Sequence, residues 1–335
     1  MDLRSTGTDD LELLETVFIC IRVTELRGAI VRTAAIRAVI GVSALALTVG
    51  LAACGENKPS GNAAGQPPTV VASTDVWGSV AQAVAGDHAK VTSIITSASA
   101  DPHSFEASPS NAAAITDASL VVFNGGGYDH WVDDILSSHP GVASVDAFSL
   151  LKAPPGEPQP ANEHVFYDLD TAKAVAAKIA DQLAQDDPQH AADYKANAET
   201  FDRNVDAIAQ TEKAIRATHS GAAVVATEPV AHYLLVAAGL TDKTPAGFAN
   251  AVEQDTDPAP VDVAAMLDVI KSRQVSAVVF NEQTVTEVTK QIQAAAQSAG
   301  IPVVPVTETL PAGSDYLSWQ RDTADRLSAA LQQNR

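Results

Sequence analysis

The feature that most constrains the fold is a long central stretch whose pattern fits a single helix. It begins at Asp187-Pro188, a capping residue followed by a proline at the first helical position, and no Gly or Pro interrupts it before Gly221. Its apolar or small residues recur at steps of four and three: Tyr194, Ala198, Phe201, Val205 and Ile208. About 30 residues at roughly 1.5 Å each make a rod of about 45 Å, too long for one lobe of this chain, so we expect it to bridge two.

Short β-branched runs alternate with helical patterns on both sides of this helix. The expected strands are residues 69–73, 91–96 and 120–123 before it, and 222–227, 275–280 and 301–306 after it. Helical patterns in the second set cover residues 261–272, 285–299 and 316–332. Such alternation indicates βα units. The sequence therefore predicts an α/β fold of two lobes, each with a parallel β-sheet flanked by helices, joined by one long rigid helix.

The N-terminus has the pattern of an export signal. An apolar run of small residues, Val39–Ala53, follows three arginines and ends in Leu51-Ala52-Ala53-Cys54. This ending resembles the lipobox of bacterial lipoproteins, in which the chain is cut before the cysteine and its thiol is acylated; the alternative is a free cysteine beside an ordinary cleavage site. The acidic start of the chain fits no signal peptide, so we interpret the translation start as lying further along, at Val23 or Val31.

These patterns predict the domain organisation. Residues 1–53 are a signal peptide with a misassigned upstream start, and residues 54–68 are a lipid-anchored tether. The N-terminal α/β lobe is expected at 69–186, the linking helix at 187–220 and the C-terminal α/β lobe at 221–335.

Composition excludes several classes of function. The formal charge of −20 would repel nucleic-acid phosphates, so no nucleic-acid partner is expected. The chain has only two cysteines, Cys20 and Cys54, which excludes a disulfide framework and a cysteine-rich metal site. Any site chemistry must therefore use histidines, carboxylates and hydroxyls.

Four side chains are candidate metal ligands. His103 follows the second expected strand, Glu228 and Glu308 each follow a strand of the second set, and His164 precedes a helix with Val175, Ile179 and Leu183 on one face. Carboxyl ends of parallel strands gather at one edge of a sheet, where ligand sites form. Two imidazoles and two carboxylates suit Zn²⁺, Mn²⁺ or Fe²⁺. Taken singly, each histidine fits a solvated loop residue and each glutamate fits a helix cap or solvated group.

A set of motifs then points to a family. Asp101-Pro102-His103, Asn162–Asp168 (NEHVFYD), Thr227–Tyr233 (TEPVAHY), Val278–Thr284 (VVFNEQT) and Thr307–Pro311 (TETLP) occur in order along nearly all of the chain after Thr69. Together with the lipobox, they resemble the zinc/manganese solute-binding lipoproteins of ABC importers, the TroA-like superfamily of periplasmic metal-binding proteins.

The resemblance implies a function and a ligand set. It implies an extracytoplasmic monomer, anchored by lipid at Cys54 to the outer face of the bacterial cytoplasmic membrane. Such a protein captures one Zn²⁺ or Mn²⁺ between its lobes and delivers it to a membrane permease, without acting as an enzyme. Matched motif by motif, His103, His164, Glu228 and Glu308 take the four ligand positions, with Glu308 aligned on the least sequence.

Departures from the family pattern leave alternatives open. Glu163 replaces a usual proline, Phe166 replaces a frequent tryptophan, and the expected loop over residues 153–163 contains no histidine, which leaves zinc and manganese both possible. Two other functions remain: a surface-anchored metal-dependent hydrolase, and an adhesion or interaction lipoprotein. No His-Glu-x-x-His motif supports the hydrolase.

Other notable residues are expected to have structural roles. Asn124–Gly127 (NGGG) lacks the Lys-Ser/Thr of a phosphate-binding loop and is expected to form a close turn. His130 and His232 lie among apolar and aromatic residues, and Glu282 is expected to support or cap the site rather than to bind metal.

Overall fold

The computed structural model describes residues 66–96, 102–152, 161–254 and 256–333. Every described residue belongs to one compact unit, which spans Asn57–Arg335. The predicted signal peptide, Cys54 and most of the predicted tether lie outside the described residues.

The first half of the described chain builds a four-stranded parallel sheet. Its elements are β1 (Thr69–Thr74), α1 (Asp75–Ala85), β2 (Lys90–Ile95), α2 (Pro109–Thr116), β3 (Leu120–Phe123), α3 (His130–Ser138), β4 (Ser144–Asp146) and the 3₁₀ turn η1 (Phe148–Leu150). The strand order is β2-β1-β3-β4, with Val70 of β1 paired to Val91 of β2 and to Leu120 of β3. Because β2 and β3 lie on opposite sides of β1, the strand order reverses there. Ligand-binding crevices form at such points, here at the carboxyl ends of β1 and β3.

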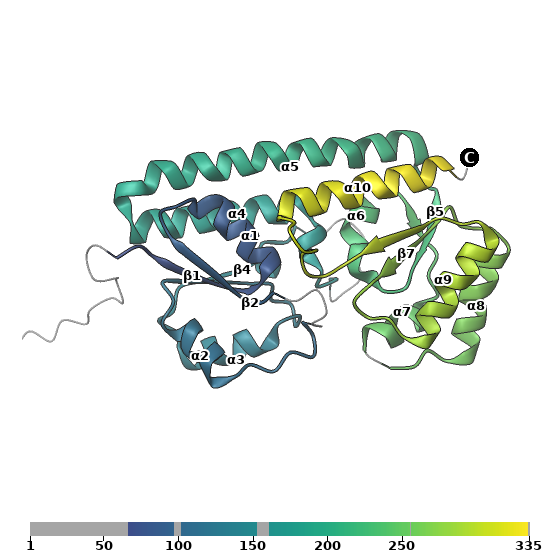
Figure 1. Cartoon of the computed structure of the whole chain (residues 1–335), viewed down its shortest axis with the longest axis horizontal. Coiled ribbons are helices and arrows are strands. Elements are labelled where there is room, and N and C mark those ends of the chain that lie inside the picture. The colour runs from purple at the N-terminus through teal and green to yellow at the C-terminus, as the bar shows by residue number, and fades with distance from the viewer. Residues whose placement is uncertain (1–65, 97–101, 153–160, 255, 334–335) are drawn as a thin grey trace, which may run out of the picture. The chain divides into compact units, whose positions relative to one another are not determined.

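Two helices connect this sheet to the next. After the 3₁₀ turn η2 (Val165–Tyr167), α4 (Leu169–Asp186) leads through η3 (Pro188–His190) into α5 (Ala191–His219). Asp168 caps α4, its carboxylate accepting a hydrogen bond from the Thr171 amide at 2.6 Å. The 29-residue α5 packs against α1 and α4 of the first half and against α6 and α10 of the second, as Figure 1 shows along its length.

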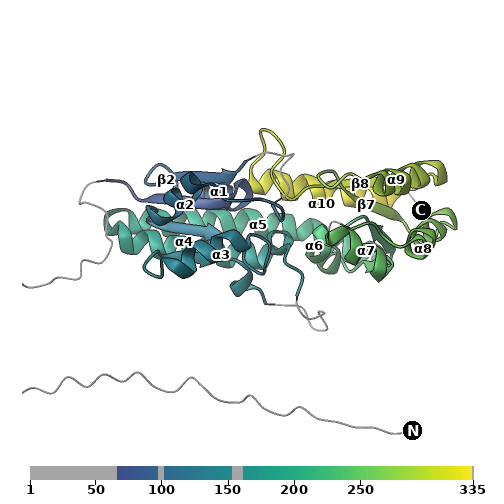
Figure 2. The ribbon, with the colours of Figure 1, turned by 90° about the horizontal axis from the view of Figure 1, so that it is seen from below.

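The second half repeats the first topology. Its elements are β5 (Ala223–Ala226), η4 (Pro229–Ala231), α6 (His232–Ala237), β6 (Thr241–Asp242), α7 (Ala246–Glu253), α8 (Pro260–Lys271), β7 (Ala277–Asn281), α9 (Glu287–Ala299), β8 (Val303–Val306) and α10 (Tyr316–Gln333). The strand order β6-β5-β7-β8 is again all parallel. In the turned view of Figure 2, α7, α8 and α9 belong to this half, and α10 lies beside α5.

The predicted fold class is confirmed, including the long helix. The six expected strands all form, each within two residues of its predicted ends. The sheets also gain β4 and β6, whose three and two residues are too short to give a hydrophobic signal of their own. The long helix begins with a 3₁₀ turn at Pro188, because the Asp187 carboxylate accepts from His190 Nδ1 and the Tyr194 hydroxyl instead of capping a helical amide.

The core explains why valine-rich runs become these strands. Leu120 to Phe123 of β3 and Ala277 to Asn281 of β7 are buried at every position, as strands covered on both faces must be. One hydrophobic cluster joins β1, β3, α1, α4, α5, β5, β7 and α10. Two smaller clusters fill the opposite faces, one under α2 and α3 and one under α7, α8 and α9. Both sheets are thereby fixed to one helical layer.

Glu212 is a charged residue buried in this layer. It lies on α5 with only 5% of its surface exposed, and burial, followed by the charges of Asp168 and Asp170, raises its pKa to about 8. A carboxyl with a raised pKa holds a proton in the folded state that the unfolded chain has lost. The free energy of unfolding should therefore fall as pH rises from about 4.5 to about 8.

We predict that Glu212→Gln stabilises the protein in a pH-dependent way. At pH 8.5 the variant should gain on the order of 2 kcal/mol, or a few degrees in Tm, because the amide needs no proton to be neutral. At pH 5 the variant and the wild type should have the same Tm. Thermal unfolding of the metal-free protein at both pH values checks this, and an equal Tm at pH 8.5 would contradict it.

Candidate metal centre

The candidate ligands come from four different loops at the carboxyl ends of the strands. His103 lies between β2 and α2, and Glu228 and Glu308 each follow a strand, β5 and β8, by two residues. His164 lies directly before η2. Each loop is fixed by the βα unit to which it belongs, so residues up to 205 positions apart in the sequence (103 to 308) reach one place.

Three of the four predicted residues form one cluster. Glu308 Oε2 lies 3.3 Å from His103 Nε2 and 3.7 Å from His164 Nε2. One ligand atom from each of the three residues lies within 4.8 Å of the others. The side chains of His164 and Glu308 are 1% exposed, whereas that of His103 is 22% exposed. The cluster is thus closed on the Glu308 side and opens past His103.

The two buried members direct unsatisfied atoms at one another. Among the described residues, neither His164 Nε2 nor Glu308 Oε2 has a hydrogen-bond partner, although both are buried. The other ring nitrogen, His164 Nδ1, lies 3.1 Å from the Asn162 side-chain oxygen, which can only accept. In the neutral ring Nδ1 therefore carries the proton, and the lone pair of Nε2 faces Glu308. Buried polar atoms without partners are costly, so this arrangement favours a bound cation.

Glu228 stands beside the cluster and is joined to it by Asn281. The Asn281 side-chain amide donates to Glu228 Oε2 and, at 2.8 Å, to Glu308 Oε1. The Thr284 hydroxyl also donates to Glu228 Oε2. These hydrogen bonds use Glu228 Oε2 and Glu308 Oε1. The other oxygen of each carboxylate, Glu228 Oε1 and Glu308 Oε2, accepts from neither Asn281 nor Thr284.

The carboxylates around His103 and His164 favour the protonated forms of both rings. Burial disfavours the charged ring of His103, but Glu308, then Glu253 and Glu163, outweigh it and raise the pKa of His103 to about 9. The pKa of His164 is also raised, against the opposing effect of burial. Burial would raise the pKa of Glu308, yet its contacts with the two histidines hold it well below its usual range.

The pKa of Glu228 is raised rather than lowered, because no histidine in the described part of the chain pairs with it. Burial first, and then the charge of Glu308, raise the pKa of Glu228 to about 7, against the hydrogen bonds from Thr284 and Asn281. A buried carboxyl near half-protonation would gain from a cation that arrives and replaces its proton.

Aromatic rings and hydrogen bonds between the halves hold the loops. The Tyr128 ring packs edge-on against His103 and His164, with centroids 4.6 and 5.7 Å away. The Tyr167 hydroxyl donates to the Thr307 carbonyl at 2.9 Å, and the Tyr233 hydroxyl donates to the Asn162 carbonyl at 2.6 Å. Loops of the first half are thus tied to loops of the second directly beside the cluster.

Two acidic residues near the cluster were not predicted as ligands from the sequence. Glu163 Oε1 lies 3.9 Å from His103 Nδ1, and Glu253 Oε1 at the end of α7 lies 3.8 Å from His164 Nδ1. His103, Glu163 and Glu253 also present one ligand atom each within 4.8 Å of the others. Glu163 was noticed only as a departure from a family pattern, and no motif marks Glu253.

The other residues singled out in the sequence lie apart from the clustered ligand atoms. His130 and His232 begin α3 and α6, and neither belongs to a group of side chains placed to hold a metal within the described part of the chain. The expected turn at Asn124–Gly127 forms, with Gly125 at a φ of 73° and its amide donating to Asp129 at 2.8 Å. The Glu282 amide donates to the Val306 carbonyl.

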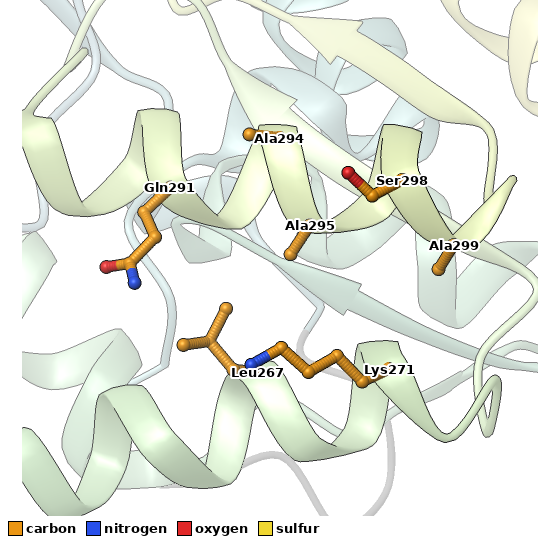
Figure 3. A pocket seen from close by; sticks show the side chains of 7 residues that line it. All are labelled: Leu267, Lys271, Gln291, Ala294, Ala295, Ser298 and Ala299. Carbon is orange, nitrogen blue, oxygen red and sulfur yellow. The ribbon is translucent and has the colours of Figure 1, made fainter.

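A surface groove elsewhere lacks metal ligands. It lies between α8 and α9 and is shown in Figure 3, lined by Leu267, Lys271, Gln291, Ala294, Ala295, Ser298 and Ala299. None of these side chains is a histidine, cysteine or carboxylate, so the groove and the candidate metal centre are separate features. Among the described helices, none has the length and apolar character needed to cross a membrane.

The fold and the site together define a class of protein. Two parallel-sheet lobes that share a long helix and enclose clustered ligand atoms between their loops are the architecture of a helix-linked solute-binding protein. Residues 70–330 match the family model described as "Zinc-uptake complex component A periplasmic", ZnuA. The chain belongs to this ZnuA family. Its members are solute-binding proteins and not enzymes, so membership does not support the hydrolase alternative.

Known proteins similar to this chain agree with that assignment. The manganese-binding lipoprotein MntA of Halalkalibacterium halodurans is 26% identical over 70% of this chain and 78% of its own length. The iron-binding protein YfeA of Yersinia pestis is 26% identical over 79% of this chain and 84% of its own. Among solved structures, the periplasmic zinc-binding protein TroA of Treponema pallidum has the same fold, with a TM-score of 0.67, 16% identity, and coverage of 79% of this chain and 99% of that one.

Proposed function

We propose that this protein captures one divalent transition-metal ion, Zn²⁺ or Mn²⁺, and delivers it to the permease of an ABC importer. His103, His164 and Glu308 are the proposed core ligands, and Glu228 is the proposed fourth. The metal is cargo, so a site made wholly of protein ligands suits the task better than one that keeps an open position for water, as catalytic zinc sites do.

One observation carries this proposal. His164 Nε2 and Glu308 Oε2 are buried, have no hydrogen-bond partner among the described residues, and lie 3.7 Å apart with His103 Nε2 beside them. A metal ion between these atoms would coordinate both and replace the protons that the raised pKa values of the histidines place there.

Glu228 is suited to complete the set through its free oxygen. Asn281 and Thr284 both donate to Oε2, so we assign Oε1 as the oxygen that binds the metal ion. The resulting two nitrogens and two oxygens suit zinc in a tetrahedral site. Manganese prefers more oxygen ligands, which water or the second carboxylate oxygens would supply.

The family assignment supports the location and partners proposed here. Importers of this type pair a solute-binding protein with a membrane permease. We propose that Cys54 carries the lipid anchor that keeps this chain at the outer face of the cytoplasmic membrane and that the protein acts as a monomer. The strong negative charge of the chain gives nucleic acid no role.

Metal content is the test of this function. The purified protein should retain one ion per chain by elemental analysis, and Zn²⁺ and Mn²⁺ should compete for it. His103→Ala should lower the affinity about 100-fold or more, because it removes a ligand rather than a supporting group. Absence of binding and of any thermal shift with either ion would refute the proposal.

Asn281 offers a separate prediction about carboxylate positioning. Asn281→Leu keeps the side-chain size but removes the amide that Glu228 and Glu308 share. We expect metal affinity to fall about 10- to 100-fold, as for the loss of other groups that orient metal ligands. Calorimetric titration with Zn²⁺ checks this, and Gln274→Leu serves as control because that amide donates to the exposed Ser272, away from both carboxylates. Equal affinities of the Asn281 variant and the wild type would show that the carboxylates position themselves.

A further inference from the structure

The mouth of the candidate metal centre carries a second group of possible ligands. Glu163 comes from the loop before η2 in the first half, and Glu253 ends α7 in the second. Both direct carboxylate oxygens at the histidines from outside the His103, His164 and Glu308 cluster. His103 belongs to both groups, since its Nε2 faces Glu308 at 3.3 Å and its Nδ1 faces Glu163 at 3.9 Å.

Exposure distinguishes the two groups. The side chains of Glu163 and Glu253 are 27% and 19% exposed, against 1% for His164 and Glu308. An ion arriving from solvent can therefore contact the outer group while it still holds part of its water shell. The inner group can be reached only after that shell has been shed.

The outer carboxylates lack the usual compensation of surface acids. Neither forms an ion pair with a lysine or arginine in the described part of the chain; their ion-pair contacts there are with the two histidines. Glu253 Oε2 is buried and has no hydrogen-bond partner among the described residues. The two carboxylates repel each other and are offset only by the neighbouring histidines, so a divalent ion between them is favoured.

The backbone holds Glu163 at the mouth independently of its carboxylate. Its carbonyl accepts a hydrogen bond from the Asn124 side-chain amide at 2.8 Å, and the Asn124 oxygen accepts from the Trp77 indole at 3.2 Å. A change at the carboxylate should therefore leave the loop in place. This makes Glu163→Gln a local test.

We propose that His103, Glu163 and Glu253 form an outer cation site that first captures a partly hydrated divalent metal ion and passes it to the inner site. This inference rests on the proposed metal-capture function. The two sites share the ring of His103 and are filled in sequence. With one imidazole and two partly exposed carboxylates, the outer site binds weakly and exchanges fast, whereas the inner site binds tightly.

The first test is the rate of metal association. In the double variant Glu163→Gln/Glu253→Gln, the stopped-flow association rate for Mn²⁺ should fall about tenfold, while the dissociation rate changes less than about twofold. The control Asp134→Asn/Glu199→Gln removes the same charge from exposed positions on α3 and α5 and should leave the association rate within about twofold. An unchanged rate in the first variant, or an equal fall in the control, would overturn the outer site.

The second test isolates the outer site at equilibrium. His164→Ala disables the inner site but leaves all three outer residues, so it should retain weak Mn²⁺ binding, visible as loss of the free-ion signal in electron paramagnetic resonance. Addition of Glu163→Gln and Glu253→Gln should weaken this residual binding at least fivefold. If the two Glu→Gln changes leave the residual Mn²⁺ affinity unchanged, the outer site alone is refuted. If the wild-type protein binds neither Mn²⁺ nor Zn²⁺, the proposed function is refuted as well.

Discussion

Replacement of His164 by alanine is expected to weaken zinc binding by more than about 100-fold, beyond the loss typical of residues that merely orient ligands. His164 is fully buried, and its Nε2 lies 3.7 Å from Glu308 Oε2. The variant leaves His103 and Glu308 in place but removes a proposed nitrogen ligand that the rest of the cluster cannot replace. Competition with a chelator of known affinity measures the loss.

Two further variants make this result specific. His232→Ala removes a histidine at the start of α6, outside the ligand cluster, and should leave the affinity within about twofold. His164→Gln largely preserves side-chain volume beside Tyr128 and Phe166, so a loss as large as that of His164→Ala would separate ligation from packing. Equal losses in the His232 and His164 variants would mean that the metal binds elsewhere.

The strands and the long helix could be predicted because each carries its own local signal. Runs such as Leu120 to Phe123 are apolar throughout, and α5 shows four- and three-residue spacing without a break. The short edge strands β4 and β6 could not be predicted, because two or three residues show no period and form only against an existing neighbour.

The ligand candidates were predictable to the extent that strand ends converge. His103 and Glu308 follow strands, so the parallel topology places each loop at the carboxyl edge of its own sheet, and the shared helical core brings the two sheets together. Glu253 ends an ordinary helix, and only the packing of α7 against α8 and the sheet turns it to His164. The role of Asn281 was equally hidden, since its two carboxylate partners lie 53 and 27 residues away along the chain.

The pH dependence of metal binding should extend to higher pH than free histidine would allow. An ordinary histidine pKa near 6.5 would make affinity level off above neutral pH. Here burial is outweighed by Glu308 and its acidic neighbours, which raise the pKa of His103 to about 9 and also raise that of His164. At pH 7 the metal-free pair therefore holds protons that a metal ion must displace.

As pH rises, metal affinity should increase and the metal-free protein should become less stable. Affinity should rise with pH up to about 9, at about tenfold per unit if one proton is displaced, or about 100-fold between pH 6.5 and 8.5. In the metal-free protein, the stabilisation that His103 gains from Glu308 is fully present below the unfolded pKa of 6.5 and is lost as pH rises through about 9. High pH thus weakens the metal-free cluster while it strengthens metal binding.

Calorimetry in buffers of different ionisation enthalpy counts the displaced protons directly. At pH 7 we expect at least about one proton released per Zn²⁺ bound, because His103 titrates two units above that pH. In His103→Ala the release should fall along with the affinity, whereas His232→Ala should release as many protons as the wild type. Zero release at pH 7, or an affinity that is flat from pH 6.5 to 8.5, would show that neither histidine must lose a proton to bind the metal and would exclude both as ligands.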